Sequence, residues 1–130
     1  MTDKKNKTIL LVDDDMDIIE VNKAVLENDG YTIDYALNGK DGLQKAFDIA
    51  PDMIVLDVMM DSIDEGFTVA RELRKNDSTK NIPLIMLTAI NEQSGFPWKY
   101  EKDETWLPVD IFLEKPVKPN DLLNNVRRLV

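Results

Sequence analysis

Acidic side chains stand directly after two short apolar runs of this sequence. Asp13, Asp14 and Asp15 follow the first run, and Asp57 follows the second. Clustered carboxylates repel one another unless a cation neutralises them. Oxygen ligands favour a hard ion, and Mg²⁺ prefers an octahedral shell of oxygens that includes several waters. No EF-hand spacing indicates calcium. If these carboxylates meet in space, their types therefore predict a magnesium site.

The carboxylates meet only if the two apolar runs are neighbouring parallel strands. Strand-length apolar runs alternate with amphipathic stretches along the chain, which is typical of a parallel sheet covered by helices on both faces. In such an α/β sheet, ligands bind beyond the carboxyl ends of the strands. Thr88 and Lys115 follow two later runs, so we expect a hydroxyl and an ammonium group at the same edge. The expected strands are Ile9 to Val12, Tyr31 to Ala36, Met53 to Leu56, Leu84 to Leu87 and Ile111 to Leu113.

Helical spacing of apolar residues predicts an amphipathic helix after every strand except the fourth. Asp29-Gly30 and Pro51 are stop signals for the first two helices, and Asn38-Gly39 is expected to make a turn between them. Pro119 suits the first position of the last helix. The expected apolar faces, in chain order, are Ile18, Val21, Val25 and Leu26; Leu43, Ala46, Phe47 and Ala50; Phe67, Ala70 and Leu73; and Leu122, Leu123, Val126, Leu129 and Val130.

The segment from Asn91 to Leu107 has no helical pattern. It contains a glycine, a proline and a run of charged residues, so we expect the fourth-helix region to be irregular. Its aromatic residues Trp98, Tyr100 and Trp106 are candidates either for contact with a partner or for packing a long loop. Since the chain ends on its last helix, we expect no second domain and an output that passes through a partner.

The composition excludes several kinds of chemistry. With no cysteine and no histidine among 130 residues, the chain has no thiol nucleophile, no His-based triad and no phosphohistidine of its own. The net charge of −9, from 25 acidic and 16 basic residues, argues against a nucleic-acid-binding surface. No apolar run approaches the roughly 20 residues of a membrane helix. We expect a cytoplasmic protein that binds neither nucleic acid nor membrane.

Each candidate residue has an ordinary structural interpretation when it is taken alone. Asp15 or Asp17 suits a helix N-cap, and Asp57 suits a capping position after its strand. Thr88 alone would be a common strand-end residue, and Lys115 alone would be a surface lysine. Their joint placement at the ends of four strands is what favours a functional site.

Four segments carry a family resemblance. LLVDDD, IVLDVMM, MLTA and FLEKPV resemble, in the same order, the signature segments of response-regulator receiver domains. The resemblance implies a flavodoxin-like receiver fold, an α/β fold whose doubly wound, five-stranded parallel sheet has the strand order 2-1-3-4-5. We place the receiver domain at residues 8–130, after an N-terminal tail of residues 1–7.

The resemblance assigns the carboxylates to a Mg²⁺-dependent phosphoacceptor site. Asp57 resembles the phosphoacceptor, and Asp14 resembles the direct ligand of the metal. Asp13 resembles the acid that reaches the metal through water, and Met59 the position whose backbone carbonyl binds it. The implied function is that of a single-domain response regulator. Such a protein takes its phosphoryl group from a sensor histidine kinase or a histidine phosphotransfer protein.

The resemblance also implies a switch. Thr88 and Lys115 resemble the hydroxyl and ammonium groups that hold the phosphoryl oxygens, and Phe112 resembles the family's switch aromatic. On phosphorylation, Thr88 would move inward and Phe112 would turn into the vacated space, which changes a face that binds an unknown downstream protein. The same resemblance implies a cis peptide at Lys115-Pro116 and leaves open a homodimer of the phosphorylated form.

Two departures from the family pattern concern the loops near the site. The loop from Asp61 to Phe67 lacks the usual proline at position 61 and is one residue longer than the common pattern. By the resemblance, Met59 and Ile90 occupy the family positions nearest to the path of a hydrolytic water, and neither has a polar group to hold it. We therefore predict a long-lived phosphorylated state, unless a polar side chain of the neighbouring loops positions the water instead.

Two other functions compete with this interpretation. Asp13-x-Asp15, with the later Thr88 and Lys115, mimics a phosphatase of the haloacid-dehalogenase type. That type is disfavoured because Met16-Asp17 replaces its Gly-Thr pair and no acidic pair follows a strand after Lys115. A receiver-like interaction domain that works without phosphorylation is disfavoured because every acceptor, metal and phosphate-holding position is filled. We expect no enzymatic turnover beyond the chain's own phosphorylation and dephosphorylation.

Overall fold

Within the residues that the structure describes, five parallel strands form one sheet in the order β2-β1-β3-β4-β5. The computed structural model describes residues 7–57, 63–88, 110–114 and 117–129. Both the strand order and the parallel direction confirm the fold expected from the sequence. The strands are β1 (Thr8–Val12), β2 (Thr32–Ala36), β3 (Met53–Asp57), β4 (Leu84–Thr88) and β5 (Ile111–Glu114).

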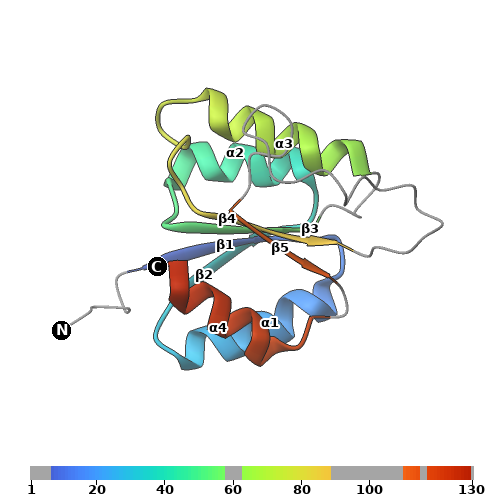
Figure 1. The fold of residues 1–130 in the computed structure, drawn as a ribbon, viewed down its shortest axis with the longest axis vertical. Coiled ribbons are helices and arrows are strands. Elements are labelled where there is room, and N and C mark those ends of the chain that lie inside the picture. Colours follow the sequence, from blue (N-terminus) through green and yellow to red (C-terminus); the bar gives the residue numbers. More distant parts are fainter. Residues whose placement is uncertain (1–6, 58–62, 89–109, 115–116, 130) are drawn as a thin grey trace.

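Helices cover both faces of this sheet (Figure 1). In the described part of the chain, α2 and α3 pack together on one face, and α1 and α4 pack together on the other. The sheet is therefore doubly wound, as expected. The irregular segment expected at residues 91–107 lies outside the described residues. No described helix combines the length and the apolar character that a membrane span requires. The helices are α1 (Met16–Asn28), α2 (Gly39–Ile49), α3 (Ile63–Lys75) and α4 (Pro119–Leu129).

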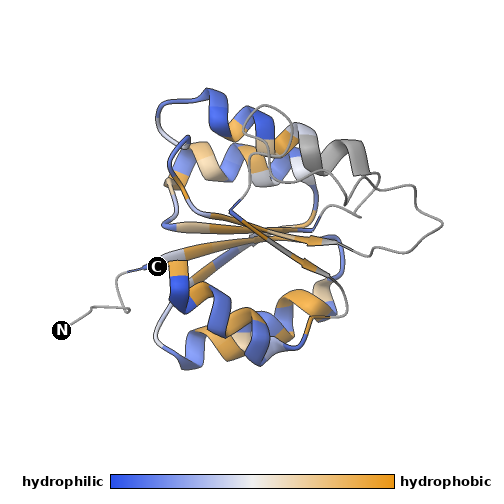
Figure 2. Ribbon diagram, viewed as in Figure 1, coloured by the Kyte–Doolittle hydropathy of each residue, from blue (hydrophilic) through white to orange (hydrophobic). Residues whose placement is uncertain are grey.

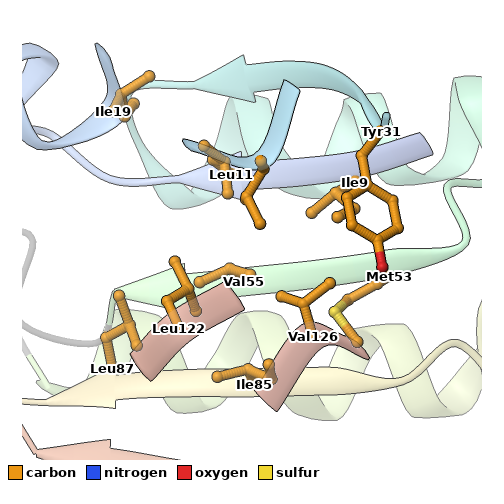
Figure 3. Close-up of a cluster of buried hydrophobic side chains, with 11 residues drawn as sticks. Ile9, Leu11, Ile19, Tyr31, Met53, Val55, Ile85, Leu87, Leu122 and Val126 are labelled. Carbon is orange, nitrogen blue, oxygen red and sulfur yellow. The ribbon is translucent and has the colours of Figure 1, made fainter. Parts of the chain in front are cut away.

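Each face of the sheet has its own apolar core, because successive side chains of a strand point to opposite faces. The strands β1, β3 and β4 are largely orange in Figure 2, as expected for strands buried on both faces, whereas the edge strand β2 is mostly half-buried or exposed. Figure 3 shows the core on the side of α1 and α4, to which Ile19, Leu122 and Val126 contribute from the helices. The other core is formed by Leu10, Val12, Ile54, Leu56, Leu84 and Met86 of the strands with Ala46, Val69, Ala70 and Leu73 of α2 and α3.

Side-chain caps start the first two helices. Asp15 is the N-cap of α1, since its Oδ1 accepts hydrogen bonds from the backbone N–H groups of Asp17 (2.9 Å) and Ile18 (3.4 Å). This confirms the capping interpretation of Asp15. Asn38 caps α2 in the same way and accepts from the backbone N–H of Asp41 at 2.8 Å. The turn expected at Asn38-Gly39 lies one residue earlier, at Leu37 and Asn38, because Gly39 is already the first helical residue.

The buried face of α1 differs from the expected one. Ile19, Asn22 and Leu26 are buried, whereas Val21 is 51% exposed and Ile18 is only partly buried. The helix turns its i, i+3, i+7 row toward the sheet, and the middle residue of that row is polar. A prediction based on apolar residues alone does not identify this row as the buried face, because Asn22 is polar. The expected face of α1 is thus wrong by about one position, although Leu26 belongs to both.

The ends of the other helices agree with the expectations more closely. Leu122 and Val126 are the buried residues of α4, which begins at Pro119 as expected. α1 is followed by Gly30 with a φ of 103°, a conformation that suits glycine after a helix. Ala50 is the exposed, left-handed C-cap of α2 with a φ of 45°, so it is not part of that helix's buried face.

Candidate metal and phosphoacceptor site

Strand register brings two of the expected carboxylates side by side. Val12 of β1 pairs with Leu56 of β3 in the parallel ladder. The next residue on each chain segment is Asp13 and Asp57, and both therefore lie at the carboxyl edge of the sheet. The backbone N–H of Asp13 still donates to the carbonyl of Ala36, the last residue of β2, at 3.1 Å. The backbone of Asp13 is thus fixed by the hydrogen bond to the end of β2 and by the pairing of the preceding residue, Val12, with β3.

Asp13, Asp14 and Asp57 form a carboxylate cluster. One carboxylate oxygen from each residue lies within 4.8 Å of the others. An octahedral Mg²⁺ with bonds of about 2.1 Å has ligand oxygens about 3 to 4 Å apart, so small side-chain movements suffice for all three to reach one ion. Three hard oxygen donors also match the ligand preference of this ion. The carboxylate cluster therefore fits a magnesium site, as the residue types predict.

The carboxylate cluster joins a buried region to solvent. Asp13 and Asp57 are only 4% and 2% exposed, whereas Asp14 is exposed. A buried carboxylate must be compensated by hydrogen bonds or opposite charge. Asp13 Oδ1 accepts a hydrogen bond from the backbone N–H of Asp15 at 2.9 Å, which also fixes the orientation of the carboxylate. Because Asp14 is exposed, a hydrated ion from solvent can contact its carboxylate first and then reach the two buried acids.

The backbone of Thr88 lies at the same edge. Thr88 is the last residue of β4, and its neighbour Leu87 pairs with Asp57. Thr88 in turn pairs with Glu114, the residue before Lys115. The register of β3, β4 and β5 therefore directs these strand ends to one place, as the parallel arrangement predicts.

Several predictions about the site concern residues or side chains that lie outside the part of the chain that the structure describes. They concern the side chains of Thr88 and Phe112, and all of Met59, Ile90 and Lys115, including the cis peptide. The same holds for the aromatic residues of the segment 89–109. These roles stay predictions.

Two observations correct or extend the set of candidate residues. Asp15, counted at the rim from its place after the first strand, is the helix cap described above and is not part of the carboxylate cluster. Asn22 was missed: it is 8% exposed and lines, together with Asp13, a small pocket of about 10 Å³ behind the cluster. Its helical spacing to Ile19 and Leu26 is the signal that could have located it.

Ion pairs elsewhere shift the pKa of individual groups. Lys45 Nζ lies 2.6 Å from Asp34 Oδ1, and this hydrogen bond lowers the pKa of Asp34 from its ordinary 3.8. Asp29, the C-cap of α1, accepts hydrogen bonds from Arg127 of α4 and raises the pKa of that guanidinium. Burial raises the pKa of Tyr31. These groups tie elements of the scaffold together and belong to no candidate site.

Comparison of the sequence with known proteins identifies the family of this chain. The family model for the response regulator receiver domain matches residues 9–127. RpaA of Synechocystis, named a DNA-binding dual master transcriptional regulator, is 34% identical over 94% of this chain and 48% of its own length. ResD of Bacillus subtilis, named a transcriptional regulatory protein, is 34% identical over 98% of this chain and 50% of its own length. The chain thus spans about half the length of these relatives.

Two solved structures of similar fold are matched over nearly their whole length. The chemotaxis response regulator CheY4 of Vibrio cholerae superimposes with a TM-score of 0.81 at 28% identity and covers 95% of this chain and 98% of its own. A CheY-like receiver domain protein of Methanospirillum hungatei gives a TM-score of 0.76 at 29% identity, with 94% and 91% coverage. With the family model spanning nearly the whole chain, this protein belongs to the response regulator receiver domains, the phosphoryl-accepting modules of two-component signalling.

Proposed function

We propose that this chain accepts a phosphoryl group on Asp57, with Mg²⁺ bound directly by Asp14, Asp57 and the carbonyl of Met59 and through water by Asp13. The observation that carries the proposal is the carboxylate cluster, whose three ligand atoms lie within 4.8 Å of one another at the carboxyl edge of the sheet. Of the three acids, Asp57 combines burial with a position at the very end of the central strand β3.

The chemistry follows from this position. An Asp57 oxygen forms a bond to phosphorus while the bond from phosphorus to the donor histidine nitrogen breaks, and the imidazole keeps that electron pair and takes up a proton. A carboxylate is a weak nucleophile, so positioning and electrostatic stabilisation must supply most of the rate. Mg²⁺, when bound, neutralises charge on the phosphoryl oxygens. Asp57 is almost fully buried, which excludes competing water from its carboxylate.

We assign the phosphoryl-holding and switch roles to Thr88, Lys115 and Phe112. The backbone of Thr88 ends the strand beside Asp57, and Glu114, its partner in β5, directly precedes Lys115. An ammonium and a hydroxyl at these positions would bind the oxygens that Mg²⁺ does not reach. Attraction of Thr88 to the new phosphoryl group would then displace the β4 end and let Phe112 turn inward.

The phosphoryl donor and the output target are proposed to be proteins. The chain contains no histidine, so a phosphohistidine donor must be another molecule, a sensor histidine kinase or a histidine phosphotransfer protein. The curated relatives are named as transcriptional regulators, but this chain matches only about half of each. We propose a cytoplasmic regulator with a single domain (residues 8–130 after the tail 1–7), and its likeness to CheY4 over 98% of the length of that protein supports the single domain. The net charge of −9 favours a protein target over nucleic acid.

A phosphodonor assay tests the proposal. The full chain is incubated with Mg²⁺ and acetyl phosphate, and the modified residue is located by mass spectrometry. We expect label on Asp57 alone, lost in Asp57→Asn and after chelation of Mg²⁺. Asp77→Asn is the matched control, because the Asp77 side chain is 95% exposed and follows the C-terminal end of α3, away from the carboxylate cluster. Label on serine or threonine, or label that survives in Asp57→Asn, would overturn the acyl-phosphate mechanism.

The same samples test the absence of general phosphatase activity. The haloacid-dehalogenase interpretation needs Asp13 and Asp15 to act together, yet Asp15 Oδ1 is engaged by the first backbone N–H groups of α1. We therefore expect no sustained hydrolysis of p-nitrophenyl phosphate. Repeated turnover of that ester that disappears in Asp13→Asn would instead favour the phosphatase.

A further inference from the structure

A buried amide lies behind the carboxylate cluster. The buried polar side chains among the described residues are Asp13, Asn22, Asp57 and Thr79. The Thr79 hydroxyl donates to the Leu73 carbonyl at 2.6 Å, and the two acids belong to the cluster. Asn22 is 92% buried, and its side chain makes no hydrogen bond within the described part of the chain. A buried amide without a hydrogen-bond partner lowers stability. We therefore expect the Asn22 amide, on the sheet-facing row of α1, to bind a ligand or an ordered water.

The pocket beside Asn22 contains two polar side chains and several apolar ones. It has a volume of about 10 Å³ and is lined by Leu11, Val12, Asp13, Ile19, Asn22, Val55 and Leu87. Figure 3 shows Leu11, Val55 and Leu87 on three neighbouring strands and Ile19 of α1 at the same end of the core. A space of this size is at the lower limit for a single water molecule. Its apolar walls disfavour any ion.

The two polar groups complement a water molecule. An amide offers both donors and an acceptor, and the Asp13 carboxylate offers acceptors. We propose that one ordered water in this pocket links the Asn22 amide to the Asp13 carboxylate, and that Asn22 is thereby a positioning residue of the magnesium site. This inference rests on the proposed function. Asp13 Oδ1 is already oriented by the N–H of Asp15, and the water adds a second constraint from the side of α1.

The consequence is that α1 and the metal site are coupled through one side chain. Groups that hydrogen-bond to metal-binding carboxylates orient them, and their loss weakens metal binding even though they touch no metal. Asn22 would act in this way on Asp13. Replacing it by leucine removes the water's partner while keeping an apolar contact with the core. Replacing it by serine keeps a hydroxyl that can hold water.

The experiment uses the full chain labelled with ¹⁵N. Contacts between water and the Asn22 side-chain amide are measured by NMR on the wild type, and Mg²⁺ affinity is measured from backbone amide shifts of Asn22→Leu, Asn22→Ser and the control Leu26→Val. Leu26 lies on the same buried row of α1 but does not line the pocket. We expect a long-lived water at Asn22, Mg²⁺ affinity about tenfold lower in Asn22→Leu, and affinities within about threefold of wild type in Asn22→Ser and Leu26→Val.

Each result decides the inference. A dry pocket, or equal Mg²⁺ affinity of the wild type and Asn22→Leu, overturns it. Loss of affinity in Leu26→Val to the same extent as in Asn22→Leu also overturns it, because the effect would then be one of packing. Failure of the proposed function appears differently: the wild type itself would bind no Mg²⁺ and accept no phosphoryl group from acetyl phosphate, whatever residue 22 is.

Discussion

Gly42 of α2 lies against Val12, the residue that precedes Asp13. A Cβ atom at Gly42 would be 2.7 Å from Cγ2 and 2.8 Å from Cγ1 of Val12. Carbon atoms pack favourably only at about 3.5 Å or more, so the absence of a side chain is what lets α2 approach β1 this closely. The contact supports the end of the strand from which the first two carboxylates of the site project.

Gly42→Ala should destabilise the protein. Alanine is favoured over glycine within a helix by about 1 kcal/mol, but an extra methyl group in a packed contact costs about 1–3 kcal/mol. We expect a lower urea midpoint than in the control Lys40→Ala, which changes an exposed residue of the same helix. A midpoint equal to or above that of the wild type would mean that Val12 moves aside at little cost.

Alanine substitution of the adjacent residues Asp14 and Asp15 should affect different properties: Mg²⁺ binding for Asp14 and the stability of the fold for Asp15. Asp15 caps α1, so Asp15→Ala should cost about 1 kcal/mol of stability and leave Mg²⁺ binding in place. Asp14 belongs to the carboxylate cluster, so Asp14→Ala should abolish Mg²⁺ binding with little change in stability. Urea unfolding without Mg²⁺ and a Mg²⁺ titration measure the two quantities separately. Intact binding in Asp14→Ala would remove this residue from the metal's ligands.

The ion pair of Asp34 with Lys45 should make stability depend on pH in the acid range. Since the hydrogen bond from Lys45 lowers the pKa of Asp34 below 3.8, the pair stabilises the fold above that pH, and the contribution is lost as the pH falls through the folded-state pKa. The Asp34 side chain is 37% exposed, so we expect a loss below about 1 kcal/mol in Asp34→Asn at pH 7.

Urea midpoints at two pH values test this expectation. The deficit of Asp34→Asn at pH 7 should shrink as the pH is lowered below 3.8, because the wild-type carboxylate becomes protonated and the ion pair is lost as the pH falls through the folded-state pKa. Asp77→Asn serves as the control, because its side chain is 95% exposed. A deficit of equal size at both pH values would show that the Asn side chain perturbs the fold for another reason.

The lifetime of the phosphorylated state is a prediction from sequence alone. Met59 and Ile90 have no polar group with which to orient a water for attack on phosphorus, and poor positioning forfeits much of the rate. Phosphorylated wild type should therefore lose its label more slowly than Met59→Asn or Ile90→Glu. Decay of the label after removal of the phosphodonor measures this. If neither polar substitution accelerates the loss, the apolar pair is not what protects the bond.

Local patterns in the sequence were sufficient to predict the sheet and the carboxylate cluster. β1, β3 and β4 are apolar runs because both of their faces are buried, and that property is visible without knowing the partners. Parallel strands then bring their carboxyl ends to one edge, so Asp13, Asp14 and Asp57 could be placed together from the strand ends alone. The cap at Asp15 was likewise a local signal.

Tertiary packing alone decided which sides of the helices are buried and which distant groups meet. Asn22 is buried and Val21 exposed because the rotation of α1 depends on the shape of the sheet beneath it, and the spacing of the apolar residues in α1 is not enough to determine that rotation. The Asp110 carboxylate, just before β5, accepts hydrogen bonds from Arg74 at 3.1 Å and from the backbone N–H of Leu84 at 2.8 Å, which lie 36 and 26 residues earlier in the sequence. Sequence patterns record what each segment needs to bury, whereas these contacts depend on how the segments fit against one another.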